Sequence, residues 1–298
     1  MDLLSSQIPT PLQRLMNAAT EKAGVALYIK RDDLIHPTVS GNKWRKLKYN
    51  LLEAKARSET AVLTFGGAYS NHLYATAAAG NALGLKTIGI VRGLELENKE
   101  NATLQFCRER GMQLHFVTRE EYRQRNSKDY LKHISNRFDR PYLIPEGGTT
   151  ALALKGVAEM VYEVRDQLGS LPDFIATAVG TGGTAAGILS AGANALAFSA
   201  LKGGDFLRDD ISELLNECKT PGNLALLTDY HFGGYAKWNN ELLAFMQDFR
   251  AEFGIQLEQV YTAKMFYGLF DLIQKGYFKA GTTVVAVHTG GLQGLIRV

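Results

Sequence analysis

The chain has 298 residues, of which 46% are hydrophobic and 21% charged, with a formal net charge of +3. This composition excludes a disordered chain, and a small positive charge without a basic block argues against nucleic-acid binding. The length predicts two packed domains or one large one. The N-terminal segment lacks the features of a signal peptide, and no apolar run reaches the roughly 18 residues of a membrane span. We therefore expect a cytoplasmic protein without a membrane partner.

Short apolar runs alternate with amphipathic stretches along the first half of the chain. Strands are predicted at 61–65, 87–91 and 113–117, and helices from about 70 onward and at 98–110. This rhythm predicts right-handed βαβ units and a parallel sheet. The pattern repeats with an apolar run at 142–145, a helix at 151–168 and strands at 174–179 and 283–288. The small-residue segment 191–204 fits either a packed helix or a mobile loop.

Four predicted strands end in glycine-rich turns. These turns lie at 66–67, 147–148, 180–183 and 290–291. A single such pair is explained by a tight turn alone. Because ligands of open α/β sheets bind beyond the carboxyl ends of the strands, we expect the four turns to converge on one site.

The turn at 180–183 has the pattern of a phosphate-binding loop. It follows a buried strand and opens a helix, whose free N–H groups and dipole favour an anion. Thr181 and Thr184 add hydroxyl donors. The segment is neither a P-loop nor a dinucleotide fingerprint, since no Gly-Lys-Ser/Thr follows and no acidic residue stands about 20 positions later. A small phosphorylated cofactor is favoured.

Lys43 follows Ser40-Gly41-Asn42, a turn and N-cap signal, and opens a predicted helix. A helix N-terminus lowers a lysine pKa, and the neutral amine suits Schiff-base chemistry. Lys46 and Lys48 are interpreted as solvated surface charges.

The segment Gly66 to His72 also joins a strand end to a helix start. Ser70 and Asn71 are natural N-cap residues, and the same free N–H groups are able to hold a carboxylate.

Histidines and cysteines give no metal pattern. His72, His231 and His288 have no carboxylate or cysteine at ligand spacing, so core or hydrogen-bonding roles are predicted and no metal is expected. Cys107 and Cys218 match no disulfide framework, are expected to be inert, and favour a reducing compartment.

These motifs, in this order, resemble the fold-type-II (tryptophan-synthase-β-like) enzymes that depend on pyridoxal 5'-phosphate (PLP). Within them they are most similar to D-cysteine desulfhydrase and aminocyclopropane-carboxylate (ACC) deaminase. The resemblance runs from Thr10 to Gly291 and rests on Ile-Lys-Arg-Asp-Asp at 29–33, Gly-Asn-Lys-x-Arg-Lys-Leu at 41–47, Ser-Asn-His at 70–72, Tyr-Thr at 261–262 and His-Thr-Gly-Gly at 288–291. It implies a two-domain α/β fold with parallel twisted sheets flanked by helices. The large PLP-binding domain would comprise 1–45 plus 154–298, and the small domain 46–153.

The resemblance also implies a role for each matching residue. Lys43 carries the cofactor as a Schiff base and later moves the Cα proton. Asn71 hydrogen-bonds the cofactor's phenolic oxygen, and Ser70, Asn71 and His72 hold the substrate carboxylate. Tyr235 and Tyr261 face the substrate and assist proton transfer. The remaining cofactor contacts fall on Gly180, Thr181, Gly182, Gly183, Thr184, Thr262 and Thr289. With Lys43, the catalytic set is Ser70, Tyr235 and Tyr261.

Two positions separate the activities within this group. ACC deaminases carry a glutamate where Thr262 stands, to pair with the pyridine nitrogen, and commonly a leucine where Thr289 stands. A threonine is a weaker partner, and a weaker electron sink suits β-elimination of a good leaving group. The resemblance thus implies α,β-elimination on a small amino acid, D-cysteine giving pyruvate, ammonia and sulfide.

Alternatives are an ACC deaminase or serine dehydratase of the same fold, or a non-catalytic module that binds PLP or an amino acid. Three departures bear on the substrate. Tyr69 precedes Ser70 and would narrow the carboxylate site, Ala236 replaces a glycine usual after Tyr235, and the chain is shorter around 190–220. A homodimer is implied.

Overall fold

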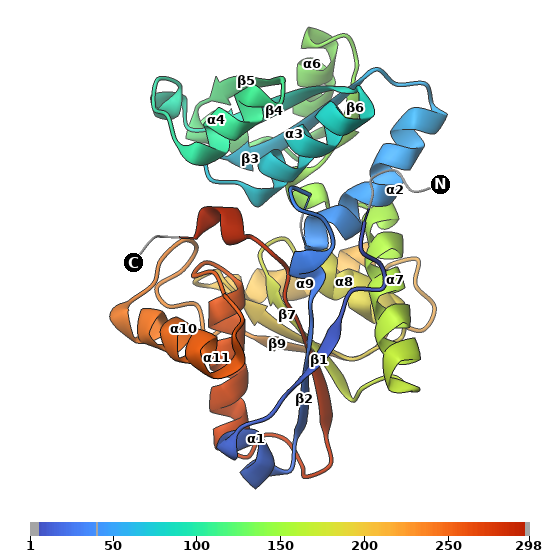
Figure 1. Cartoon of the computed structure of the whole chain (residues 1–298). Coiled ribbons are helices and arrows are strands. Elements are labelled where there is room, and N and C mark those ends of the chain that lie inside the picture. The colour runs from blue at the N-terminus through green and yellow to red at the C-terminus, as the bar shows by residue number, and fades with distance from the viewer. Residues whose placement is uncertain (1–5, 40, 296–298) are drawn as a thin grey trace.

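The computed structural model describes residues 6–39 and 41–295. Ser40, part of the turn predicted before Lys43, lies outside the described residues. The strands form a four-stranded sheet, uppermost in Figure 1, in the order β5-β4-β3-β6, and a six-stranded sheet below it in the order β1-β2-β10-β7-β8-β9. Neighbouring strands are parallel except β1 and β2, which pair antiparallel. The predicted α/β class with parallel sheets is confirmed.

The small sheet and its helices come from one continuous stretch of chain. Its strands are β3 (Ala61–Gly67), β4 (Lys86–Arg92), β5 (Met112–Val117) and β6 (Tyr142–Ile144). Its helices are α3 (Asn71–Leu83), α4 (Ala102–Glu109), α5 (Arg119–Arg123) and α6 (Lys128–Arg137). Helix α4 is shorter than predicted because Asn101 caps its N-terminus. All these elements lie within 46–153, whereas the domain bounds themselves stay a prediction.

The large sheet combines the two ends of the chain. Its strands are β1 (Leu12–Leu15), β2 (Ala26–Lys30), β7 (Phe174–Val179), β8 (Ala195–Ser199), β9 (Leu224–Leu227) and β10 (Thr283–Val287). Its helices are α1 (Ala18–Ala23), α7 (Ala151–Leu168), α8 (Gly183–Ser190), α9 (Leu207–Leu214), α10 (Asn240–Phe253) and α11 (Thr262–Gln274).

The segment 191–204 is neither a helix nor a loop. It contains β8, whose five residues are all buried and which pairs with β7 on one side and β9 on the other. A central strand covered on both faces needs no alternation of polar and apolar residues, so its sequence lacks the usual strand signature. That is why the sequence left helix and loop open and missed the strand.

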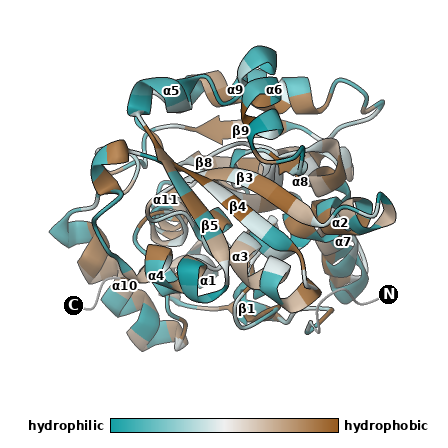
Figure 2. Ribbon diagram, turned by 90° about the horizontal axis from the view of Figure 1, so that it is seen from above, coloured by the Kyte–Doolittle hydropathy of each residue, from teal (hydrophilic) through white to brown (hydrophobic). Residues whose placement is uncertain are grey.

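Alternate residues of the central strands enter two cores. Ala176 of β7 packs in the cluster with α10 and α11, whereas its neighbour Ile175 packs in the cluster with α7 and α8. Figure 2 shows the apolar strands enclosed by helices that are hydrophilic on their outer sides. Because helices cover both faces of the sheet, a site can form at the carboxyl ends of its strands.

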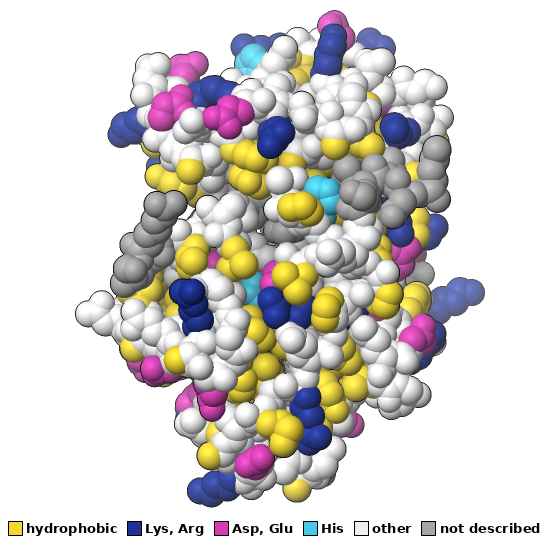
Figure 3. All heavy atoms as spheres, viewed as in Figure 1, with side chains coloured by type: hydrophobic (Ala, Val, Ile, Leu, Met, Phe, Trp, Pro, Cys, Tyr) yellow, Lys and Arg dark blue, Asp and Glu magenta, His cyan; other side chains and the backbone are white. Residues whose placement is uncertain are grey.

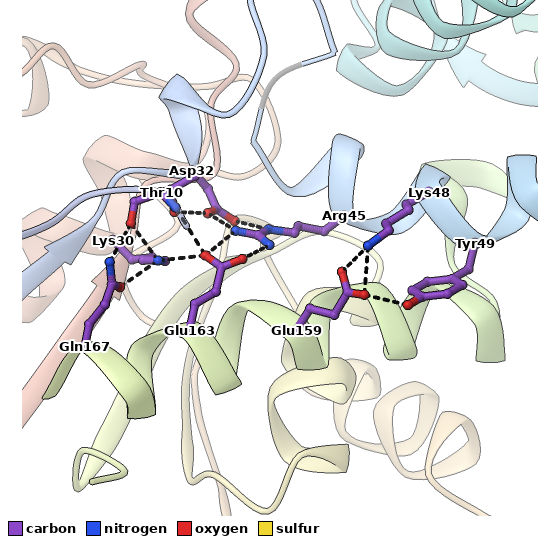
Figure 4. A network of polar contacts seen from close by, with 9 residues as sticks. All are labelled: Thr10, Lys30, Asp32, Arg45, Lys48, Tyr49, Glu159, Glu163 and Gln167. Atoms are coloured by element: carbon purple, nitrogen blue, oxygen red, sulfur yellow. Dashed lines mark hydrogen bonds and ion pairs between the residues drawn. The ribbon is translucent and has the colours of Figure 1, made fainter. Parts of the chain in front are cut away.

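Helix α2 (Asn42–Ala56) is fixed to the large sheet by a buried polar network, drawn in Figure 4. Arg45 of α2 pairs with Asp32 at 2.9 Å and with Glu163 of α7 at 2.5 Å. Lys30 of β2 pairs with Glu163 at 2.8 Å and donates to the Thr10 carbonyl at 2.7 Å. The network therefore sets where the first turn of α2, with Lys43, lies.

Charged side chains of both signs are interspersed over the face drawn in Figure 3. In the part of the chain that the structure describes, no helix is both long and apolar enough to cross a bilayer.

Candidate active site

A cleft of about 1040 Å³ opens where the strands of both sheets end. All four glycine-rich turns contribute to its lining, through Gly67 and Gly147 from the small sheet and 180–183 and Gly290 from the large one. The prediction that the four turns converge on one site is confirmed. Their convergence joins segments more than 200 residues apart in the sequence.

Lys43 lies in the first turn of α2 and lines the cleft. Burial lowers the pKa of its amine to about 8, and the nearby Glu258 acts in the opposite direction. The expected pKa depression is thus present, but desolvation rather than the helix dipole is its main cause. Nζ donates to Oδ1 of Asn42 at 3.1 Å, and the amide of Asn42 donates to Thr184 at 2.9 Å. This places the reactive amine beside the loop at 180–184.

Gly41, the residue before α2, has φ +62, in the left-handed region. A Cβ there would stand 1.8 Å from the carbonyl oxygen of Thr289, so only glycine allows this close approach. The contact brings the 289–291 turn against the start of α2.

The loop at 180–184 leads into α8, whose N-terminus has no side-chain cap. Gly183 and Thr184 line the cleft, so the free N–H groups of this uncapped helix start are available to a ligand there. A Cβ on Gly183 would stand 2.7 Å from the Thr149 hydroxyl and 2.9 Å from Nζ of Lys46. The arrangement is an anion cradle with a lysine at its edge, and it fits a phosphate group.

Lys46 is not a solvated surface charge, so that interpretation was wrong. Its side chain is 1% exposed, and Nζ donates to Thr149 at 2.8 Å, whose hydroxyl in turn lies 2.9 Å from that of Thr181. Burial, with Lys43 nearby, lowers its pKa well below the ordinary value. A phosphate dianion would restore the ammonium form by pairing with it. Lys48 is partly buried and pairs with Glu159 at 2.7 Å.

Ser70, Asn71 and His72 lie at the start of α3, as predicted, and all three line the cleft. Ser70 caps the helix, since its hydroxyl oxygen accepts from the N–H groups of His72 and Leu73 at 3.2 and 3.3 Å. Oδ1 of Asn71 accepts from the Gln293 amide at 2.7 Å. The hydroxyl proton of Ser70 and the backbone N–H of Asn71 are left to bind an incoming carboxylate.

Tyr235 and Tyr261 face each other across the cleft wall with ring centroids 6.0 Å apart, in an edge-on arrangement. Burial raises the pKa of both hydroxyls; their mutual contact raises that of Tyr261 further and partly offsets the rise for Tyr235. Both hydroxyls therefore remain protonated near neutral pH.

The two threonines of the predicted set differ in position. Thr289 lines the cleft, whereas Thr262 is fully buried and is not among the lining residues. The Thr262 hydroxyl accepts from the Glu258 N–H at 2.9 Å and donates to the Glu258 carbonyl at 3.3 Å. Tyr69 is also outside the lining and is 71% exposed.

Glu258 is a buried residue of the site that the sequence analysis missed. Its carboxylate accepts from the N–H groups of Val260, Tyr261 and Thr262 at 2.7, 2.9 and 2.6 Å. It therefore caps α11 and fixes the backbone of Tyr261. Burial raises the pKa of this carboxyl. An acidic residue just before the stretch 261–270, whose aromatic residues recur at helical spacing, was the available signal.

Each of the three histidines for which a core or hydrogen-bonding role was predicted has a hydrogen-bond partner. Nε2 of His72 lies 2.7 Å from the Thr64 hydroxyl, Nε2 of His288 lies 2.7 Å from the Gln256 carbonyl, and Nδ1 of His231 accepts from Gly233 at 2.9 Å. Within residues 6–39 and 41–295, no three His, Cys, Asp or Glu side chains gather as metal ligands would.

Comparison with known proteins gives the same class as this geometry. Residues 3–290 match the family described as "Pyridoxal-phosphate dependent enzyme". A crystal structure of an ACC deaminase homologue superposes with a TM-score of 0.80 at 29% identity, over 98% of this chain and 92% of that one. The chain belongs to this family, and its cofactor is PLP.

Curated relatives narrow the group. The chain is 34% identical to a putative ACC deaminase of Thermotoga maritima, over 96% of this chain and 95% of the relative. It is 34% identical to a bifunctional D-cysteine desulfhydrase/ACC deaminase of Arabidopsis thaliana, over 97% and 78%, and 29% identical to a D-cysteine desulfhydrase of Klebsiella pneumoniae, over 96% and 93%. The protein is a PLP-dependent lyase of the ACC deaminase and D-cysteine desulfhydrase group.

Proposed function

We propose that this enzyme eliminates sulfide from D-cysteine, with water as co-reactant, to give pyruvate, ammonia and hydrogen sulfide. The observation that carries the choice is the residue after Tyr261. A carboxylate there would pair with the pyridine nitrogen and strengthen the electron sink, but this chain has Thr262, whose hydroxyl is engaged by the Glu258 backbone. A weak sink suffices when the leaving group departs easily, as a thiolate does.

The residues of the cleft suit each task of this reaction. When bound, PLP supplies the electron sink for negative charge at the substrate Cα. The 180–184 loop and Lys46 would hold the phosphate, and the start of α3 would hold the substrate carboxylate. Lys43, whose pKa is about 8, is able to take the Cα proton on Nζ. Tyr235 and Tyr261 stay protonated and are placed to donate a proton to the departing sulfur.

ACC deamination is the second candidate. It is favoured by the names of several relatives, including the Thermotoga maritima protein, and by a relative that carries both activities. Serine dehydration is a third reaction of the same fold. All of these reactions release ammonia, so ammonia alone does not separate them.

A substrate panel tests the proposal. The purified holoenzyme is given D-cysteine, L-cysteine, D-serine, L-serine and ACC, while sulfide and the keto acid are measured separately. We expect sulfide and pyruvate in equal amounts from D-cysteine and at least tenfold slower turnover of ACC. Faster turnover of ACC than of D-cysteine would overturn the proposal in favour of the second candidate.

The Lys43→Ala variant is the control for the chemistry. We expect it to lose the visible absorption of the covalently bound cofactor and all sulfide release. Bound PLP without turnover of any substrate by the wild-type protein would instead favour a binding module.

We further propose that the enzyme is a cytoplasmic homodimer without nucleic-acid or membrane partners. Neither Cys107 nor Cys218 forms a disulfide. Burial raises the pKa of Cys107 to about 12, which keeps that thiol inert. Light scattering of the purified protein measures the oligomeric state, and a monomer would contradict the dimer.

A further inference from the structure

The segment 229–237, which contains Tyr235, packs against one face of α11. The Tyr230 hydroxyl donates to Asp271 at 2.7 Å, and the rings of Phe232 and Tyr267 meet edge-on with centroids 4.9 Å apart. Lys264 stands three residues before Tyr267 and seven before Asp271, so all three lie on one side of the helix. The segment is thus docked along α11 at three successive points.

Lys264 makes the contact nearest Tyr235. Its side chain is 1% exposed, and Nζ donates to the carbonyls of His231 at 2.9 Å and Gly234 at 2.8 Å. Each carbonyl also accepts a backbone N–H of the turn, from Gly234 at 3.0 Å and from Lys237 at 3.1 Å. No carboxylate of the described residues forms an ion pair with this amine. Burying a lysine against carbonyls alone is costly, and it is retained where it has a task.

The segment that Lys264 binds includes residues in an unfavourable backbone conformation. Phe232 and Ala236 have φ of 50 and 52, and Gly233 and Gly234 between them have φ of 93 and 117. Two of these four residues carry a side chain in the left-handed region, which is unfavourable without outside contacts. Of the two carbonyls that Lys264 binds, that of Gly234 lies within this run and that of His231 directly before it.

The position of Tyr235 follows from that contact. Tyr235 comes directly after Gly234, whose carbonyl Lys264 binds, and its ring meets that of Tyr261. Tyr261 is itself the residue before α11, three positions ahead of Lys264. One helix therefore carries both Tyr261 and the amine that holds Tyr235 opposite it.

We propose that Lys264 is a positioning residue that holds Tyr235 against Tyr261 for proton transfer to the leaving group. The inference rests on the proposed function, because it acts through Tyr235. Burial lowers the pKa of Lys264 to about 8, with Glu258 opposing, which reflects the same buried environment. A purely structural lysine would stabilise the fold without any special dependence of turnover on Tyr235.

Hydrogen exchange tests the contact without any reaction. In the Lys264→Met holoenzyme we expect the backbone amides of 231–237 to exchange at least tenfold faster than in the wild type. The matched control is Lys279→Met, an exposed lysine just beyond the end of the same helix. Unchanged exchange in Lys264→Met, or equal acceleration in both variants, would overturn the inference whatever the substrate is.

A double-mutant cycle tests the route through Tyr235. We expect Lys264→Met and Tyr235→Phe each to lower kcat for D-cysteine at least tenfold, with KM within threefold, and the double variant to fall no further than Tyr235→Phe alone. The inference would be overturned if the two single losses of kcat multiplied in the double variant. A kcat of Lys264→Met within twofold of the wild type would overturn it as well. If Lys264→Met does not fold, the cycle and the exchange experiment use Lys264→Gln, whose side-chain NH2 group is still able to donate hydrogen bonds.

Failure of the proposed function and failure of the positioning role of Lys264 give different results. Absence of sulfide release by the wild type contradicts the proposed function, and the exchange experiment then still decides on the contact. If sulfide release depends on Tyr235 but the losses of kcat caused by Lys264→Met and Tyr235→Phe multiply in the double variant, only the positioning role of Lys264 is contradicted.

Discussion

Arg45, two residues after Lys43, forms a buried ion pair with Asp32. Nη2 of Arg45 lies 2.9 Å from Oδ1 of Asp32, and both side chains are 1% exposed. The pair connects α2 to the end of β2, and Glu163 of α7 completes it. The position of the reactive amine therefore depends on charges that lie outside the cleft.

Removal of that guanidinium should destabilise the protein strongly. Arg45→Met removes the ion-pair partner of the buried Asp32 and leaves Glu163 with Lys30 alone, and we expect a loss of about 3–5 kcal/mol in the free energy of unfolding. Arg57→Met is the control, because Arg57 pairs with Glu53 on the exposed side of the same helix, and a much smaller loss is expected there. Urea denaturation measures both, and equal losses would contradict the argument.

The pH dependence of cofactor loading should report the Lys43 pKa. Only the neutral amine attacks the cofactor's aldehyde, and burial holds the pKa near 8 instead of 10.5. The rate of loading of the apo-enzyme with PLP should therefore rise with pH through about 8 and level off above it. Stopped-flow absorbance follows the reaction. A rate that keeps rising to pH 10 would mean that the amine behaves as a solvated lysine.

Lys46 should contribute to cofactor affinity. Loss of a charge-assisted contact to phosphate costs about 1.5–3 kcal/mol, so Lys46→Met should raise the Kd for PLP about 10–100-fold. Lys48→Met, two residues on and paired with Glu159 outside the loop, should leave the Kd within threefold. Fluorescence titration of the apo-enzymes gives both constants, and similar values for the two variants would exclude the assigned contact.

Ala236 offers a test of the strained segment. Its φ of 52 is one that glycine adopts freely, so Ala236→Gly should raise the free energy of unfolding by about 1 kcal/mol. Ala251→Gly, in the exposed interior of α10, should lower it by about 1 kcal/mol. Opposite signs in the two variants are the expected result. A loss in both would show that residue 236 is not strained.

The amino-acid sequence by itself determined the α/β class, the strands of the small sheet together with β7 and β10, and the convergence of the four glycine turns. These are local properties: β7 and α7 follow from an apolar run and a helical period, and were predicted at their observed bounds, 174–179 and 151–168. The motif around Lys43 also predicted Schiff-base chemistry, because a helix start, a glycine turn and a lysine are adjacent in the chain, and the resemblance to the fold-type-II enzymes implied the cofactor.

Only the tertiary structure decided which polar residues are buried and what they touch. Lys46 looks like any surface lysine in the sequence, but α8 and Thr149, over 100 residues away, enclose its amine. Strand β8 lacks a local signature because neighbours cover both of its faces. Lys264 gains its role from the backbone carbonyls of His231 and Gly234, which belong to a separate segment of the chain. Burial and hydrogen-bond partners are set by distant segments, and a single sequence does not encode those contacts locally.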